Sequence, residues 1–148
     1  MSGRGSFEIV SLNVSSAKGT AKRPVDAVVF VAEAGVEGDA HAGPGDRQVS
    51  LLAVEDIEAA RASGIDVVPG SFAENVTTRG VDLPSLPIGA RLSIGPALLE
   101  VSRIGKECHG GCEIRRKSGD CVMPRRGIFA RVIVGGRVGL EDQCRYGV

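Results

Sequence analysis

The chain has 148 residues, a common size for one domain, and carries 18 basic against 18 acidic residues. Its hydrophobic share of 43% is enough for a core, although only four Phe, one Tyr and no Trp are available to fill it. The neutral total and the few aromatics argue against a nucleic-acid-binding protein, and no apolar run reaches the roughly 20 residues of a membrane helix. Since no stretch resembles a signal peptide, we expect one cytoplasmic domain over 1–148 with reduced cysteines.

Glycine is unusually frequent, with 21 residues, which predicts many tight turns between short strands. One helix is expected at 54–63, because Val54, Ile57 and Ala60 recur on one face and Gly64 follows as a stop. The expected strands are short and rich in alternating or β-branched residues: 7–14, 25–31, 48–52, 72–77, 90–94, 97–104, 128–134 and 137–140. This order predicts a mainly β fold, a closed or nearly closed barrel with one or few helices.

Two glycine-rich loops carry most of the unusual side chains, at 35–45 and at 105–126. In the first, His41 stands between Asp39 and Arg47. It is either part of a turn or a group that orients a substrate, with Asp39 fixing its tautomer. The stretch from Arg103 to Arg137 holds nine basic and three acidic residues. That local excess suits a small anion.

Three of the four cysteines lie in the second loop, as Cys108, Cys112 and Cys121, together with His109. These four side chains could bind a structural zinc ion, but adjacent ligands chelate poorly and the paired C-x₂-C spacing is missing. Alternatively, nearby basic residues favour a nucleophilic or metal-ligating thiolate. A third interpretation is that a cysteine serves only as a small buried apolar residue. We prefer it for Cys144, and it stays open for Cys112 and Cys121.

Several sequence segments are similar to the motifs of one protein family and occur in the same order along the chain. They are SAKGT at 16–20, GVEGDAHAG at 35–43, RQVSLL at 47–52, GSFAENVTT at 70–78, LPIGARL at 86–92 with IG at 94–95, GKECH at 105–109 and MPRRGIF at 123–129. Together they resemble the MOSC family, named for the C-terminal domain of molybdenum cofactor sulfurase. The similarity covers nearly the whole chain. It implies a β-barrel like that of the pyruvate kinase barrel domain, and a role in sulfur transfer or molybdenum cofactor handling.

The resemblance implies that Cys108 is the reactive cysteine, since the matching residue ligates molybdenum in related eukaryotic reductases. On this hypothesis Cys108 carries a persulfide or molybdenum, with His41 and Asp39 beside it. The residues expected to bind a molybdenum–pterin cofactor are Arg47, Asn75, Lys106, Arg115, Arg116 and Arg125. The loop at 35–45 should then lie beside the loop at 105–126, because binding sites collect on loops.

Two features of the family are not matched by this chain: the desulfurase half with its pyridoxal-binding lysine, and the N-terminal β-barrel domain of the reductases. We therefore expect a carrier or accessory protein rather than a redox enzyme with a permanently bound cofactor. Its expected partners are molybdenum cofactor biosynthesis proteins or a cysteine desulfurase, and a small anionic ligand. The alternatives are a molybdenum-dependent reductase of N-hydroxylated compounds and a zinc-stabilised interaction domain without catalysis.

Overall fold

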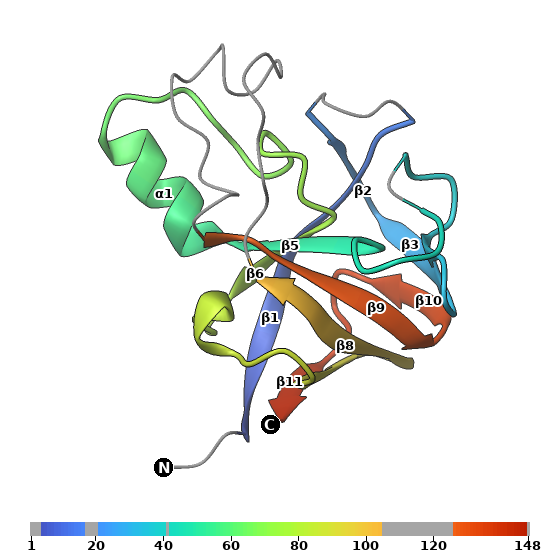
Figure 1. Cartoon of the computed structure of the whole chain (residues 1–148). Coiled ribbons are helices and arrows are strands. Elements are labelled where there is room, and N and C mark those ends of the chain that lie inside the picture. Colours follow the sequence, from blue (N-terminus) through green and yellow to red (C-terminus); the bar gives the residue numbers. More distant parts are fainter. Residues whose placement is uncertain (1–3, 17–20, 41, 105–125, 148) are drawn as a thin grey trace.

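The computed structural model describes residues 4–16, 21–40, 42–104 and 126–147, and in these ranges the fold is mainly β (Figure 1). One α-helix, α1 (Val54–Ala62), and one short 3₁₀-helix, η1 (Leu83–Ser85), accompany the strands. The strands are β1 (Arg4–Val14), β2 (Arg23–Val25), β3 (Ala27–Val31), β4 (Gly35–Val36), β5 (Val49–Ala53), β6 (Val76–Arg79), β7 (Arg91–Ile94), β8 (Ala97–Ile104), β9 (Ile128–Val134), β10 (Gly136–Gly139) and β11 (Cys144–Gly147).

Seven strands close into a barrel in the order β1-β11-β7-β8-β9-β5-β6, and β6 pairs back on β1. The first residues of β1 pair with β11 from Arg4↔Gly147 to Phe7↔Cys144, whereas its last residues pair with β2. All neighbours in the barrel are antiparallel except β5 and β6, between which α1 forms the crossover. Closure pairs both edges of each barrel strand and so removes the exposed edge of an open sheet.

The core is aliphatic, as the composition predicts. The barrel interior holds fully buried residues from most strands: Leu12, Leu51, Val76, Leu92, Leu99 and Val132. A second cluster lies outside the barrel, where Ile57 and Ala60 of α1 pack on Phe72 and Phe129. All five residues of β5 are buried, because this strand faces the barrel interior on one side and the α1 cluster on the other.

The predicted mainly β barrel with one helix is confirmed, and β8 and β9 have the predicted bounds. The predicted strand at 25–31 is divided at Asp26, because β2 pairs with β1 while β3 pairs with β10 and β4 in a small second sheet. The predicted strand at 72–77 begins only at Val76. The strand β11 was not predicted. No helix in the described ranges has the length and apolar character needed to cross a membrane.

Candidate functional site

One end of the barrel, at the upper side of Figure 1, is where β8 ends and β9 begins. Ile104 pairs with Ile128 there, and residues 105–125 connect these two strands in the sequence. The segment that follows the first glycine-rich loop lies on the same end: Ser102 Oγ donates to the Asp46 carbonyl at 2.6 Å, and Arg103 Nη1 lies 3.4 Å from the Asp46 carboxylate. This segment therefore rests on the strand that leads into the segment of Cys108.

The guanidinium of Arg47 lies over the ring of Phe129, 5.8 Å from its centroid. Phe129 is 1% exposed, so its ring is fixed by the surrounding core, and the half-buried Arg47 side chain lies against it. Such a cation–π contact holds the planar guanidinium by its face and leaves its N–H edges to donate hydrogen bonds. Arg47 is thus held at this end of the barrel in a geometry that suits an anion.

Asp39 forms a buried ion pair with Lys22, and neither side chain has any solvent exposure. Lys22 Nζ lies 2.9 Å from Oδ1 and 3.0 Å from Oδ2, and the backbone N–H of Ser15 donates to Oδ1 at 3.0 Å. Lys22 follows residues 17–20, and Asp39 precedes residue 41 by two positions. The pair therefore joins the β1–β2 connection to the segment that leads to His41.

Asn75 connects strands β1 and β5 through its side chain, which is 1% exposed. Its Oδ1 accepts from the backbone N–H of Ser50 at 3.0 Å, and its Nδ2 donates to the carbonyl of Asn13 at 3.2 Å. The backbone N–H of Asn13 donates in return to the carbonyl of Asn75 at 2.7 Å. Because both ends of the amide are engaged inside the protein, Asn75 positions the segment 70–75 against the barrel.

Glu74, the neighbour of Asn75, is a carboxyl group with no solvent exposure. Its Oε2 accepts from the backbone N–H of Gly70 at 2.8 Å and from Thr77 Oγ1 at 2.6 Å. Its Oε1 is buried and has no hydrogen-bond partner in the described part of the chain. Burial raises the pKa of this carboxyl above the ordinary 4.5, although the hydrogen bonds from Gly70 and Thr77 lower it in part.

Arg126, the first described residue after 105–125, is held by two carboxylates. Its Nε donates to Asp56 of α1 at 3.0 Å, and its Nη2 donates to Asp82, which precedes η1. These contacts fix the position at which the chain enters β9. The contact between Asp46 and Ser102 is made near the end of β8. The chain is thus held by side-chain contacts on both sides of residues 105–125.

A model of the MOSC domain family matches residues 37–145, which is well over half of the chain. The chain belongs to the MOSC domain family. This family is associated with molybdenum cofactor proteins. Among curated proteins, none matches the sequence.

Solved structures with the same fold include bacterial proteins of similar or greater length. The YuaD protein from Bacillus subtilis has a TM-score of 0.80 and 22% identity, over 99% of this chain and 98% of that chain. YiiM from Escherichia coli has a TM-score of 0.70 and 21% identity, over 97% and 70%. YiiM from Geobacillus stearothermophilus has a TM-score of 0.71 and 21% identity, over 96% and 75%. At these identities the likeness shows the fold alone.

Three of the predicted site residues of this MOSC domain lie in the described ranges, namely Asp39, Arg47 and Asn75, all near one barrel end. The others lie outside the described residues: Cys108, His41, Lys106, Arg115, Arg116 and Arg125. The expected approach of His41 to Cys108 also lies outside them, as do His109, Cys112 and Cys121. Within the described ranges, no three His, Cys, Asp or Glu side chains are grouped so that they could hold a metal ion.

Sequence reasoning missed Lys22 and Glu74 of this MOSC domain. Neither stands in a periodic apolar stretch, and the partners that bury them come from other segments of the chain: Asp39 for Lys22, and Gly70 with Thr77 for Glu74. The only usable signal for Glu74 was its place within the segment GSFAENVTT, which resembles the family. No such signal existed for Lys22.

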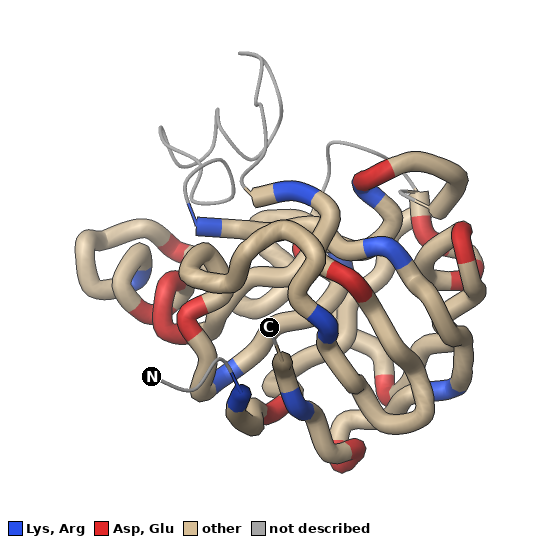
Figure 2. The backbone as a smooth tube through the Cα atoms, turned by 60° about the horizontal axis from the view of Figure 1, so that its bottom comes forward, with Lys and Arg blue, Asp and Glu red and all other residues tan. Residues whose placement is uncertain are grey.

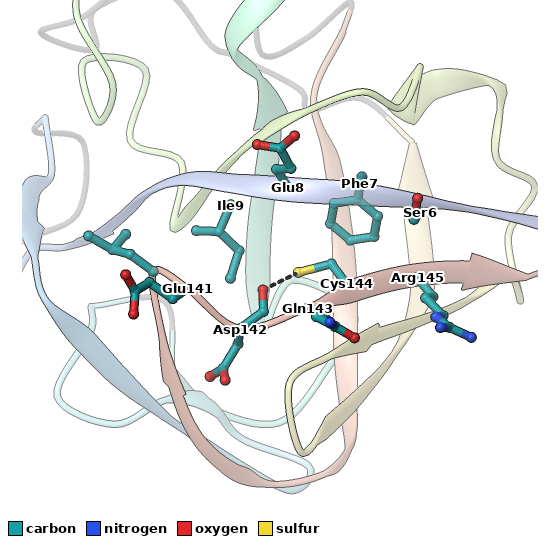
Figure 3. A pocket seen from close by; sticks show the side chains of 10 residues that line it. Ser6, Phe7, Glu8, Ile9, Glu141, Asp142, Gln143, Cys144 and Arg145 are labelled. Carbon is teal, nitrogen blue, oxygen red and sulfur yellow. Dashed lines mark hydrogen bonds between the residues drawn. The ribbon is translucent and has the colours of Figure 1, made fainter.

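Cys144 is the one cysteine in the described ranges, and it faces a pocket of about 480 Å³ at the turn before β11 (Figure 3). It is 2% exposed, and its Sγ lies 3.6 Å from the carbonyl oxygen of Asp142. Burial, with a smaller contribution from the charge of Asp142, raises the pKa of this thiol to about 12. Cys144 is therefore a neutral thiol at pH 7 and fits the interpretation as a small buried apolar residue.

Proposed function

We propose that this MOSC domain carries sulfur, or handles a molybdenum–pterin cofactor, through Cys108. The observation that supports the proposal most is the contact of Asp46 with Ser102 and Arg103. It brings the segment of Arg47 onto the strand that leads to Cys108. Residues that are 56 positions apart in the sequence thus share one barrel end, as a common site requires.

In the sulfur-carrier reaction, the thiolate of Cys108 attacks the outer sulfur of a donor persulfide, RSSH. A bond forms between the two sulfur atoms, the S–S bond of the donor breaks, and the donor leaves as the thiolate RS⁻. Cys108 then holds the persulfide, and no external oxidant or reductant is needed. The reaction requires Cys108 to be ionised, and basic residues beside a thiol favour its thiolate. Lys106, Arg115 and Arg116 are the basic residues near Cys108 in the sequence.

The described residues fit the anionic part of a molybdenum–pterin cofactor. Arg47 presents the edges of a guanidinium whose face is held by Phe129, and such an edge binds phosphate in bidentate fashion. The one thiol in the described ranges, Cys144, is buried and neutral, so a thiolate ligand would come from residues 105–125, where the resemblance to the family points to Cys108. A bound molybdenum centre would supply redox chemistry that protein side chains lack.

Asp39 and Asn75 act in this proposal as positioning residues. Asp39 holds the segment that leads to His41 through its bonds to Lys22 and Ser15, and Asn75 holds the segment 70–75 against β1 and β5. Fixed positions of this kind suit a site that handles a reactive sulfur, because small displacements of reacting groups lower rates strongly.

The proposal is tested by loading the reduced protein with a sulfane-sulfur donor and mapping persulfides by peptide mass spectrometry. We expect the added sulfur on Cys108, no transfer in Cys108→Ser, and unchanged loading in the control Cys144→Ala. Metal analysis of the same preparations adds a second measurement. Loading that persists in Cys108→Ser would contradict the proposal, as would stoichiometric zinc whose loss unfolds that variant.

A further inference from the structure

A groove of about 350 Å³ lies between the small second sheet, made of β3, β4 and β10, and the ribbon of β1 and β2. It is lined by five apolar residues and two charged ones: Val14, Val25, Ala27, Val28, Val29, Glu37 and Arg137. None of the residues named for the Cys108 site is among them. Figure 1 places β3 and β10 at the right of the molecule, beside the end of β9, whereas the candidate site lies where β9 begins.

One row of residues across the small sheet carries both charges. Arg137 of β10 pairs with Val29 of β3. On the other side of Val29, directly after β4, the backbone N–H of Glu37 donates to the Val29 carbonyl at 2.9 Å. Cross-strand neighbours point to the same face of a sheet, so Glu37, Val29 and Arg137 share one face. This face is the outer one, because all three residues are exposed while Val28 and Val36 beside them in the chain are buried.

The two charges stand on either side of an apolar strip. Neighbouring strands lie about 4.8 Å apart, so the Cα atoms of Glu37 and Arg137, two strands apart, are separated by roughly 10 Å. Between them lies β3, whose outward residues are Ala27, Val29 and Val31. Val29 and Val31 are 37% and 41% exposed, so the strip is open to a ligand.

The described protein does not neutralise either charge. In the ranges that the structure describes, Glu37 and Arg137 make no ion pair, with each other or with another residue. Of the charged residues nearby, Glu33 is held in an ion pair after the end of β3, and Arg23 and Asp26 do not line the groove. Figure 2 shows acidic and basic positions interspersed along the described backbone rather than grouped by sign. A ligand that carries both signs can therefore complete two ion pairs that the fold leaves open.

We propose that this groove binds a free α-amino acid with an aliphatic side chain. Arg137 binds the carboxylate, because a guanidinium edge matches two carboxylate oxygens, and Glu37 binds the ammonium group. Both charged groups of an α-amino acid are attached to one carbon atom, and a simple anion or cation would meet only one of the two protein charges. The aliphatic side chain packs on Val14, Val25 and Val29, where burial of apolar surface is favourable. The site is independent of the thiol chemistry proposed above.

The test is an NMR titration of the isotope-labelled full chain with L-leucine. We expect L-leucine to shift the amide signals of β3, β10 and the β1–β2 ribbon saturably. Glycine, which lacks the aliphatic side chain, should bind more weakly. L-Leucinamide lacks the carboxylate and isocaproate lacks the ammonium group, and each should bind about tenfold more weakly or worse, as expected for a lost charge-assisted hydrogen bond.

Two substitutions assign the charged groups. Arg137→Gln should weaken L-leucine binding by about tenfold or more but leave the affinity for L-leucinamide unchanged, because that ligand has no carboxylate to lose. Glu37→Gln should weaken L-leucine binding similarly and leave the affinity for isocaproate unchanged. The matched controls Arg79→Gln and Glu58→Gln remove the same charges from exposed positions outside the groove. They should change affinity by less than about twofold, as surface charges away from the ligand do.

Three results of the titration would overturn the proposal: no saturable shift with L-leucine, equal affinity for L-leucine, L-leucinamide and isocaproate, or equal loss of affinity in the groove variants and the controls. Sedimentation of the protein alone adds a fourth. A concentration-dependent dimer that is lost in Glu37→Gln and Arg137→Gln would overturn it, because the outer face of β3 would then bind a second copy of this chain.

Discussion

Lys22 and Asp39 place opposite charges where neither side chain reaches solvent. Removing one partner from such a pair leaves the other charge buried without its counter-charge. We expect Lys22→Met to lower the free energy of unfolding by about 3–5 kcal/mol, measured by urea denaturation. The double variant Lys22→Met/Asp39→Asn should recover part of this loss, because Asn keeps an acceptor for the Ser15 N–H. A loss below about 1 kcal/mol, the value of an exposed pair, would contradict the burial.

Glu74 has a pKa raised by burial above 4.5, so the folded protein binds its proton more tightly than the unfolded chain does. Stability linked to this group is therefore present below pH 4.5 and is lost as the pH rises toward the folded-state pKa. Glu74→Gln removes this titration. The free energy of unfolding of the variant should therefore rise relative to that of wild type as the pH rises above 4.5. Urea denaturation across pH measures the difference.

Glu58→Gln is the matched control for this experiment, because Glu58 is exposed on α1. Its unfolding free energy should follow that of wild type at each pH. Parallel pH profiles for wild type and Glu74→Gln would contradict the raised pKa.

At the scale of elements, the turn before Glu74 depends on a close approach of two backbones. Gly70 has φ +92°, and a Cβ at this position would fall 2.2 Å from the carbonyl oxygen of Lys22. Gly70→Ala should therefore lower stability by more than the roughly 1–2 kcal/mol of a left-handed backbone alone. Gly38→Ala is the control, because Gly38 has φ +81° and nothing within 4 Å of its Cβ position. Equal losses of unfolding free energy in Gly70→Ala and Gly38→Ala, measured by thermal or urea denaturation, would show that the close approach of Gly70 to the Lys22 carbonyl does not limit the residue at position 70.

Strands were predictable where local pattern and tertiary pairing agree. The strands β8 and β9 have the predicted bounds because their apolar residues follow the pairing along the whole length. The predicted strand at 72–77 contains strong strand formers, but Phe72 belongs to the α1 cluster and Ala73 has φ +63°. The hydrogen bonds of Glu74 and Asn75 thus replace strand pairing there, and no local pattern reveals those partners.

The candidate site residues were named only through the resemblance to the MOSC family, and their role stays a prediction. Of the residues so named, Asp39, Arg47 and Asn75 lie in the described ranges. Composition and spacing did not indicate that Lys22 pairs with Asp39, because an ion pair between residues 17 positions apart leaves no periodic signal. The strand β11 was missed for a similar reason: of its four residues only Cys144 is buried, and it becomes a strand by pairing with both β1 and β7.

For the whole molecule, β11 closes the barrel between β1 and β7. A chain that ends at Gln143 would expose the edges of both neighbours and uncover the interior at Phe7 and Ile94. We expect this truncation to abolish cooperative thermal unfolding, measured by circular dichroism. Removal of residues 1–3, which precede β1, serves as the control and should leave the transition intact. A truncated protein with the melting temperature of wild type would contradict a barrel that needs β11.

The central claim is that Cys108 is the reactive thiolate of this MOSC domain, and the order in which the cysteines react with limiting iodoacetamide tests it most directly. At pH 7 an unperturbed thiol, with a pKa of about 8.5, is only a few per cent ionised. We predict that Cys108 is alkylated first and that Cys144, whose pKa is raised to about 12, reacts only after unfolding. Alkylation of Cys112 or Cys121 ahead of Cys108 would contradict the account and move the reactive site.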